Sequence, residues 1–180
     1  MKKIFGFVGH IAAGKGVACD YLRGKYSAGY HRYSSILRDL TNRLYLPEDR
    51  DHLIRISEAM RREFGEDTLA RVIKEDVMRD EHEVVCVDGI RRLADISELR
   101  TLSGFTLVYI DADPHIRYNH LITRGEKIDD STKTFEDFLK DEQRTTELSI
   151  DEVAREAHIT ITNNGTLEAL HADLDKIVGQ

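Results

Sequence analysis

Two glycines and a lysine near the start of the chain have the spacing of a phosphate-binding turn. Gly9 and Gly14 lie five positions apart and Lys15 follows them, between the apolar run 4–8 and a helix-like stretch. Glycines let several backbone N–H groups point at one anion, and the N-terminus of the next helix adds donors and a partial positive charge. Lys15 adds a mobile charge for the outer phosphates of a nucleotide. The predicted ATP-binding residues of this turn are Gly9, Ala12, Ala13, Gly14, Lys15, Gly16 and Val17.

The two positions after this lysine lack the hydroxyl that such turns ordinarily offer to Mg²⁺. Gly16 and Val17 stand where a Ser or Thr is usual. A metal at this site must therefore be held by nucleotide phosphates, by water and by a carboxylate from elsewhere in the chain. A glycine-rich turn that binds nothing is the alternative interpretation, but the strand and helix patterns on either side favour phosphate binding.

An aspartate and two arginines follow another apolar run. Residues 83–87 have the composition of a buried strand, and they are followed by Asp88, Gly89, Arg91 and Arg92. In an open parallel sheet, ligands bind at the carboxyl edge of the strands. Asp88 is therefore the predicted contact for Mg²⁺, directly or through water. The two arginines are predicted to bind an anionic substrate, with solvated arginines after an ordinary turn as the alternative.

A long helical region, about residues 34–80, is predicted to bind the phosphoryl acceptor. Ser34 and Ser35 indicate the start of a helix. Ser35 and Arg38 are predicted substrate contacts, because a helix N-terminus and an arginine one turn later can hold an anion. Arg61 lies on the next predicted helix, and its planar fork also suits a phosphate. The same arginines would alternatively lie on a solvated helix face.

A polar stretch at about residues 123–133 has almost nothing to bury and is predicted to be an exposed, mobile lid. A closing lid excludes the water that would compete as phosphoryl acceptor. Arg124 is the predicted lid residue that approaches the transferring group. An ordinary surface loop is the alternative.

Asn164, after the last predicted strand, is a candidate for contact with the adenine of ATP, and a plain turn explains it equally well.

The remaining pattern sets the expected fold class. Strand-like segments at 4–8, 83–87, 106–110 and 159–162, with a weaker one at 29–33, alternate with helical patterns. This alternation predicts an α/β protein with a five-stranded parallel sheet and helices on both faces. Together with the glycine–lysine turn, it predicts a three-layer P-loop NTPase fold with a helical acceptor-binding insertion and a small lid.

Composition bounds the class of protein further. A chain of 180 residues is predicted to form one domain, residues 1–180, with a sizeable core. A net charge of −7 argues against a nucleic-acid partner. No apolar run approaches the roughly 20 residues that span a membrane, so no membrane association is expected. Cys19 and Cys86 are too few for a disulfide framework, which favours the cytoplasm. Both a monomer and a homodimer remain open.

These motifs resemble those of P-loop nucleoside monophosphate kinases over almost the whole chain. The segment 9–16 is similar to the Gly-x-x-x-x-Gly-Lys-Gly of adenylate kinases, and 34–38 to their acceptor-phosphate segment. Residues 88–92 resemble their Asp-Gly-Phe-Pro-Arg, with Arg91 in place of proline. Residues 124–130 resemble the lid of uridylate/cytidylate kinases, although the usual Ser-Gly-Arg is missing. The resemblance implies acceptor-phosphate contacts by Arg38 and Arg92, Asp88 near Mg²⁺, and Arg124 on the transferring phosphoryl group.

The expected function is transfer of the γ-phosphoryl group of ATP, with Mg²⁺, to a small phosphorylated acceptor. A nucleoside or deoxynucleoside monophosphate is the first candidate. The segment 157–165 also resembles dephospho-coenzyme A kinases, so that acceptor or another small metabolite is the second. A nucleotide-binding regulator that turns over slowly or not at all is the third, because Gly16 and Val17 offer no hydroxyl.

Overall fold

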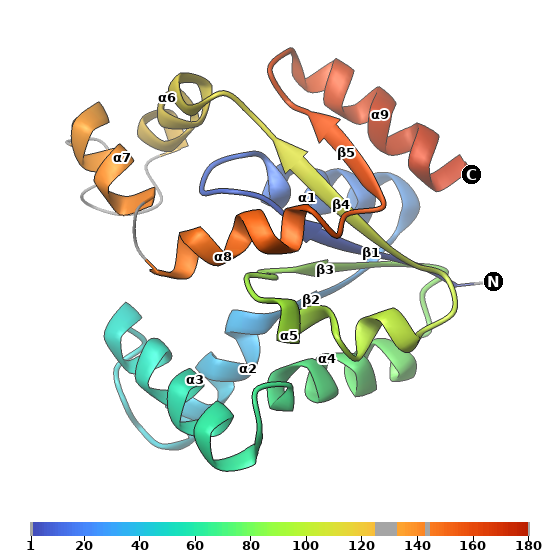
Figure 1. Ribbon diagram of the computed structural model, residues 1–180. Coiled ribbons are helices and arrows are strands. Elements are labelled where there is room, and N and C mark those ends of the chain that lie inside the picture. Colours follow the sequence, from blue (N-terminus) through green and yellow to red (C-terminus); the bar gives the residue numbers. More distant parts are fainter. Residues whose placement is uncertain (1, 125–132, 143–144, 180) are drawn as a thin grey trace.

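Five parallel strands form one sheet through the middle of the molecule (Figure 1). The computed structural model describes residues 2–124, 133–142 and 145–179. The strand order is β2-β3-β1-β4-β5, and every neighbouring pair is parallel. Each strand matches a predicted segment to within one residue at either end, so the predicted α/β fold class is confirmed. The strands are β1 (Lys3–Val8), β2 (Gly29–Arg32), β3 (Val84–Asp88), β4 (Phe105–Asp111) and β5 (Ile159–Thr162).

Helices fill the connections between the strands and cover both faces of the sheet (Figure 1). Among the residues that the structure describes, no helix is both long enough and apolar enough to cross a membrane. In chain order the helices are α1 (Lys15–Tyr26), α2 (Tyr33–Arg43), α3 (Arg50–Phe64), α4 (Thr68–Arg79), α5 (Leu93–Ile96), the 3₁₀ turn η1 (Leu99–Thr101), α6 (Pro114–Arg124), α7 (Phe135–Glu142), α8 (Thr145–Ala154) and α9 (Leu167–Gly179).

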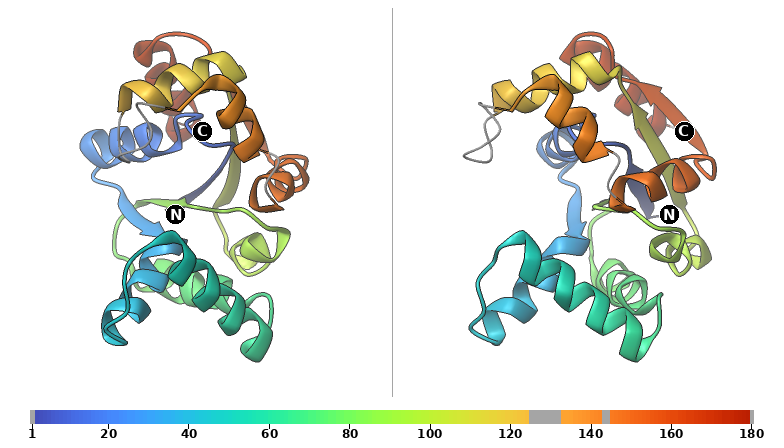
Figure 2. Two further views of the ribbon diagram at one scale, coloured as in Figure 1. Left: turned by 90° about the vertical axis from the view of Figure 1, so that its left-hand side faces the viewer. Right: turned by 60° about the vertical axis from the view of Figure 1, so that its left-hand side comes forward.

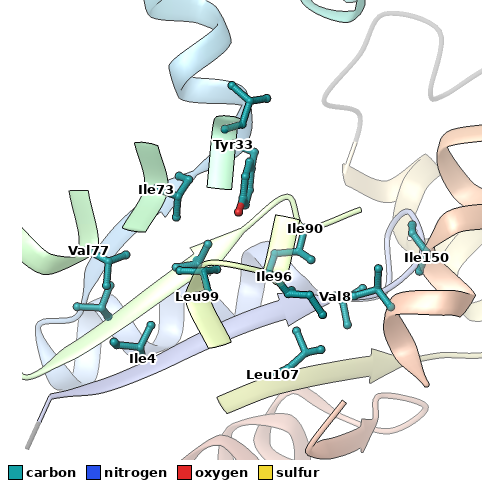
Figure 3. Close-up of a cluster of buried hydrophobic side chains, with 14 of the residues drawn as sticks. Ile4, Val8, Tyr33, Ile73, Val77, Ile90, Ile96, Leu99, Leu107 and Ile150 are labelled. Carbon is teal, nitrogen blue, oxygen red and sulfur yellow. The ribbon is translucent and has the colours of Figure 1, made fainter. Parts of the chain in front are cut away.

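One face of the sheet packs against α2, α4, α5 and α8. Ile4 and Val8 of β1 contribute to this face, because every second residue of a strand points to the same side. They belong to a buried cluster that includes Ile73 and Val77 of α4 and Ile150 of α8 (Figure 3). Burying an aliphatic side chain of this size stabilises a fold by about 1.5–3 kcal/mol. This cluster therefore fixes α8 and the connection after β2 against the sheet.

The opposite face packs against α1 and α9. Phe5 and Phe7, the alternate residues of β1, form a second buried cluster with Leu22 of α1 and Leu174 of α9. Because β1 is the middle strand and is buried on both faces, its carboxyl end emerges at the centre of the sheet edge. That end leads directly into the turn between Gly9 and Gly14.

The helices α2, α3 and α4 form a lobe at one end of the molecule, on the connection between β2 and β3 (Figure 2). This helical lobe covers the region 34–80 in which the sequence predicts helices. In Figures 1 and 2 it lies at the end of the molecule away from α6 and α7. The carboxyl edge of the sheet thus has the helical lobe on one side and the α6–α7 pair on the other.

The helix α2 begins one residue before the two serines that indicate its start. The helix begins at Tyr33, so Ser34 and Ser35 lie inside its first turn, and neither serine occupies the N-cap. The residue before the helix, Arg32, has extended backbone because it still belongs to β2. Tyr33 is buried in the first cluster, and this packing sets the helix start in preference to the serine signal.

Candidate functional site

The turn from Gly9 to Gly14 connects the carboxyl end of β1 to the N-terminus of α1. A Cβ atom on Gly9 would lie 2.4 Å from the carbonyl oxygen of Ile110. Gly14 has a φ of +108°, and a Cβ atom there would lie 2.4 Å from Nδ2 of Asn163. Both positions therefore require glycine, because β4 and the segment after β5 approach the turn closely.

The ammonium group of Lys15 folds back over this turn. Its Nζ donates to the carbonyl oxygens of Gly9 (2.7 Å) and His10 (2.9 Å). The helix α1 begins at Lys15 and carries no acidic residue in its first turn, so the positive end of its dipole is not neutralised locally. The turn, the lysine and the helix N-terminus together form an electropositive concavity that suits a phosphate.

Asp88 ends β3 beside the turn and is buried. Its Oδ1 accepts a hydrogen bond from Gly89 N (2.7 Å), and its Oδ2 accepts one from the Tyr30 hydroxyl (3.2 Å). The same Oδ2 lies 3.4 Å from Nε of Arg32, because Arg32 and Asp88 are register partners at the ends of β2 and β3. Burial, followed by the Asp88 charge, raises the pKa of Tyr30, which stays protonated and able to donate at neutral pH.

A cavity of about 810 Å³ opens between the glycine turn and the end of β3. Its walls come from the turn, the start of α1, the ends of β2 and β3, α6, α8 and the segment after β5. It brings together the whole predicted ATP-binding turn, the predicted metal contact and one of the predicted acceptor-binding arginines. These are Gly9, Ala12, Ala13, Gly14, Lys15, Gly16, Val17, Asp88 and Arg91.

Polar residues that the sequence did not single out also line the cavity, and they are Asp20, Tyr30, Arg32 and His120. Asn163, next to the predicted adenine contact, lines it as well. Arg32 ends β2 and lies one residue before the end of the weaker predicted strand at 29–33, so the rule that ligands meet the carboxyl edge of a parallel sheet points close to it. His120 comes from α6, and its Nδ1 is hydrogen-bonded to Ala12 O (3.2 Å), which brings α6 against the turn.

The other predicted acceptor-binding residues lie outside the described lining of the cavity. Arg92 is 39% exposed, and its Nη1 lies 3.5 Å from Oε2 of Glu66. Arg38, on α2, is 42% exposed and lies 3.5 Å from Oε2 of Glu48. Ser35 is exposed on the first turn of the same helix. These groups are accessible to a ligand, but their acceptor contacts stay predictions.

Arg61 has a different environment from the other arginines. Its side chain is 5% exposed, and its Nη2 donates to Oδ1 of Asp95 (2.6 Å). Its Nη1 donates to the carbonyl oxygen of Glu66. The guanidinium is thus occupied by contacts within the fold, and Arg61 is not among the described residues that line the cavity. No sequence signal marks this pairing, because Asp95 lies 34 positions away.

The two asparagines after β5 have separate environments. Asn163 is buried against the turn, and its Nδ2 donates to Ala13 O (2.9 Å). Asn164, the predicted adenine contact, is exposed, and its Oδ1 accepts a hydrogen bond from Asp113 N (2.8 Å). The structure therefore brings Asn163 to the cavity, whereas Asn164 connects two surface segments.

The predicted lid falls mainly on residues 125–132, which lie outside the described part of the chain. Arg124 is the last residue of α6, and its predicted contact with the transferring group stays a prediction. The helices on either side of the segment pack together, and the Tyr118 hydroxyl of α6 donates to Lys133 O just before α7 (2.8 Å). The helices α6 and α7 therefore pack as a pair (Figure 1), and α6 contributes His120 and Thr123 to the lining of the cavity.

The donor groups in the cavity fit a magnesium ion that enters with a nucleotide. In the described ranges, no group of three or more His, Cys, Asp or Glu side chains could form a metal cage. Asp88 and Asp20 provide two carboxylates in the cavity wall. Mg²⁺ is commonly held by one or two carboxylates together with substrate phosphates and water. A carboxylate has about four lone-pair sites, so Asp88 retains acceptor capacity beyond its present contacts.

The sheet order and the glycine–lysine turn after the middle strand define a P-loop kinase-like α/β fold. A family model described as an AAA domain matches residues 8–138, which is well over half of the chain. The chain therefore belongs to this AAA domain family.

Several known proteins match this chain over almost its full length. A UPF0200 protein of Sulfurisphaera tokodaii is 26% identical over 178 residues, covering 98% of this chain and 96% of that protein. The crystal structure of TT1252 from Thermus thermophilus has a TM-score of 0.60 at 17% identity, covering 99% and 97% of the two chains. Shikimate kinase from Acinetobacter baumannii, solved with shikimate, has a TM-score of 0.57 at 16% identity, covering 99% and 93%. At such identities the structural similarity shows the fold alone.

Proposed function

We propose that this protein transfers the γ-phosphoryl group of ATP to a nucleoside or deoxynucleoside monophosphate. The observation that carries the proposal is the shared cavity, which has Lys15 and the glycine turn on one wall and Asp88, Arg32 and Arg91 on another. One wall suits a nucleoside triphosphate, and the other presents positive charge to a second anion. Phosphoryl transfer between two phosphorylated ligands requires two such anion-binding walls around one space.

The donor would bind at the turn. Backbone N–H groups between Gly9 and Lys15 would receive the β-phosphate, as the helix N-terminus of α1 favours. The Lys15 ammonium would exchange its contacts with the carbonyls of Gly9 and His10 for phosphate oxygens. Its attraction to the phosphates would be stronger there than in water, because a desolvated cavity has a lower effective dielectric constant. Asn163 supports this arrangement because its side-chain Nδ2 donates a hydrogen bond to the carbonyl oxygen of Ala13 in the turn.

The acceptor would bind opposite the turn. An oxygen of its phosphate attacks the γ-phosphorus of ATP, the bond to the β–γ bridging oxygen breaks, and ADP leaves. Arg32 and Arg91 would hold the acceptor phosphate near the donor, with Arg92, Arg38 and Ser35 adding contacts from outside the described lining. Because two phosphates repel each other, the fixed arginines lower the free-energy cost of aligning the acceptor phosphate with the γ-phosphate of ATP.

Two further groups complete the proposal. Arg124 would approach the transferring phosphoryl group from the end of α6, as the segment at 123–133 closes and excludes water. Asp88 and Asp20 would hold Mg²⁺, directly or through water. When bound, the ion neutralises charge on the β- and γ-phosphate oxygens.

A regulatory role is the second candidate, and a specific observation favours it. Gly16 and Val17 line the cavity next to Lys15 but offer no hydroxyl to a metal. A nucleotide could therefore bind in this turn and be turned over slowly, with the bound state serving as a signal. Acceptor-dependent turnover separates this candidate from the kinase.

The experiment is coupled ADP release with ATP and Mg²⁺ across a panel of acceptors. The panel holds the common ribo- and deoxynucleoside monophosphates, dephospho-coenzyme A and shikimate. Strong release with one nucleoside monophosphate supports the proposal and names the substrate. Release with dephospho-coenzyme A or shikimate instead keeps the kinase but replaces the acceptor. ATP binding without release on any acceptor supports the regulatory candidate.

A further inference from the structure

Asp95 of α5 is buried and carries several hydrogen bonds on one carboxylate. Its side chain is 3% exposed. Its Oδ2 accepts from the backbone N–H groups of Arg91 (2.9 Å) and Arg92 (3.0 Å). Its Oδ1 accepts from Nη2 of Arg61 (2.6 Å). One carboxylate thus holds the backbone of both arginines that follow β3 and a guanidinium from α3.

The same residue connects the helical lobe to this segment. Arg61 reaches Asp95 from α3 and also donates to the carbonyl oxygen of Glu66, which lies between α3 and α4. Tyr33, the first residue of α2, donates its hydroxyl to the Asp95 carbonyl oxygen. Two of the lobe's three helices and the connection after α3 are therefore linked, through Asp95, to the turn that carries Arg91 and Arg92.

We infer that Asp95 is a positioning residue that, with Arg61, sets the Arg91–Arg92 segment for the acceptor phosphate. The inference rests on the proposed function. A backbone shift at either arginine moves the guanidinium at the end of a long side chain, and an error of about 1 Å in substrate position can cost on the order of 100-fold in rate. A carboxylate that fixes two successive N–H groups prevents this shift.

The capping of α5 accounts for the contact of Asp95 with the Arg92 N–H, but not for the buried ion pair with Arg61. A buried ion pair loses solvation of both charges on folding, so apolar residues of similar volume often give equal or greater stability. What the Asp95–Arg61 pair adds is a fixed orientation, because the planar guanidinium donates through Nη2 to Asp95 Oδ1 and through Nη1 to the carbonyl oxygen of Glu66. The pair therefore links the position of the helical lobe to the backbone of Arg91, which lines the cavity, and of Arg92 next to it.

Asp95→Asn is the principal variant. The amide has nearly the same shape but only one acceptor oxygen, so it cannot satisfy the guanidinium and both backbone donors together. The matched control is Glu98→Gln, which removes the charge from another ion pair between the lobe and this region, Lys74 to Glu98 (2.7 Å). The control leaves the backbone of the arginine segment untouched, because the N–H groups of Arg91 and Arg92 donate to Asp95.

Steady-state kinetics against acceptor and ATP separately test the inference. Asp95→Asn should raise the acceptor KM at least about tenfold and leave the ATP KM within about twofold, because donor binding uses the glycine turn. Glu98→Gln should change neither. Equal KM values in folded Asp95→Asn and wild type would overturn the inference, as would a parallel rise in both constants.

A second variant covers the case in which Asp95→Asn does not fold. Arg61→Lys keeps the positive charge but offers one nitrogen where the guanidinium donates through three, so it should show the same rise confined to the acceptor KM. Tyr33→Phe, which loses only the hydrogen bond to the Asp95 carbonyl, should show a smaller rise. If the wild type turns over no acceptor, the proposed function fails and this inference fails with it. Wild-type turnover with unaltered constants in these variants overturns the inference alone.

Discussion

The side-chain amide of Asn163 donates to the carbonyl oxygen of Ala13 (2.9 Å), which ties the end of the last strand to the phosphate-binding turn. The two residues are 150 positions apart. The same amide nitrogen occupies the space that a Cβ on Gly14 would need, at 2.4 Å. The shape of the turn is therefore set both by its own glycines and by the packing of Asn163 against it.

This contact predicts a difference between neighbouring asparagines. Asn163→Ala leaves Ala13 O without its buried donor, which should cost about 1–3 kcal/mol of the free energy of unfolding. The ATP KM should rise with it, because the turn loses a support. Asn164→Ala is the control, since Asn164 is exposed and accepts from Asp113 N. Urea unfolding and ATP titration of both variants check this, and equal effects of the two changes would contradict the role given to Asn163.

The asparagine pair also shows how far sequence reasoning reaches. Along β5 the exposed fraction alternates, with Ile161 buried and Thr162 exposed. Extending this period-two pattern by two residues places Asn163 on the inner side and Asn164 on the outer side. The alternation therefore distinguishes the two asparagines by the side of the strand on which each lies. Residue type cannot distinguish them, because both are asparagine.

The fold was predictable because buried parallel strands have a distinctive composition. Val84 to Val87 are apolar on both faces, and such runs between helical patterns define this architecture. The strand β2 was harder to predict from the sequence, because Tyr30, His31 and Arg32 carry polar groups. Tyr30 and His31 are partly buried and Arg32 is exposed. The burial of Arg61 was not predictable, since it depends on a partner that only the tertiary fold brings within 2.6 Å.

The proposed acceptor wall predicts a selective kinetic effect at Arg92. Arg92→Ala should raise the acceptor KM more than the ATP KM, by about tenfold or more, because a charge-assisted bidentate contact to phosphate is lost. Arg100→Ala is the matched control. Its side chain is also 39% exposed and also ion-paired, to Glu156 at 2.7 Å. Initial rates with each substrate varied in turn measure both constants, and a larger rise for ATP would move Arg92 to the donor side.

The position of Asp88 predicts a change in metal dependence. Asp88→Asn keeps the acceptor for Gly89 N but removes the charge, so turnover should fall on the order of 100-fold. The Mg²⁺ concentration for half-maximal rate should rise in parallel, because a neutral amide is a poor ligand for a hard cation. Titration of Mg²⁺ at fixed ATP measures this. An unaltered metal requirement would exclude Asp88 from the metal site.

A surface cluster away from the cavity predicts a pH dependence of stability. Asp175 of α9 accepts hydrogen bonds from Lys25, Tyr26 and Tyr21, at 2.7, 2.7 and 2.8 Å. These partners, Lys25 foremost, lower the pKa of Asp175 from 3.8 to about 2. Because the folded-state pKa lies below the unfolded value, the stabilisation is fully present above about pH 4 and is lost as the pH falls toward about 2.

Asp175→Asn removes this titration. The variant should therefore be less stable than wild type near neutral pH, and the difference should shrink as the pH falls through about 4 toward 2. Urea unfolding at a series of pH values gives the difference directly. A difference that stays constant over the whole range would show that the Asp175 carboxylate is not held in its ionised form by these three partners.

The central claim is that the γ-phosphoryl group passes from ATP to an acceptor phosphate, and labelled ATP follows that group itself. The protein would be incubated with γ-labelled ATP, Mg²⁺ and each nucleoside monophosphate, and the products separated. Lys15→Ala serves as the control, because its charge should be needed at the donor phosphates. The proposal predicts label in one nucleoside diphosphate with wild type and little with Lys15→Ala. Label that appears only as inorganic phosphate, or that stays in ATP with every acceptor, would contradict it.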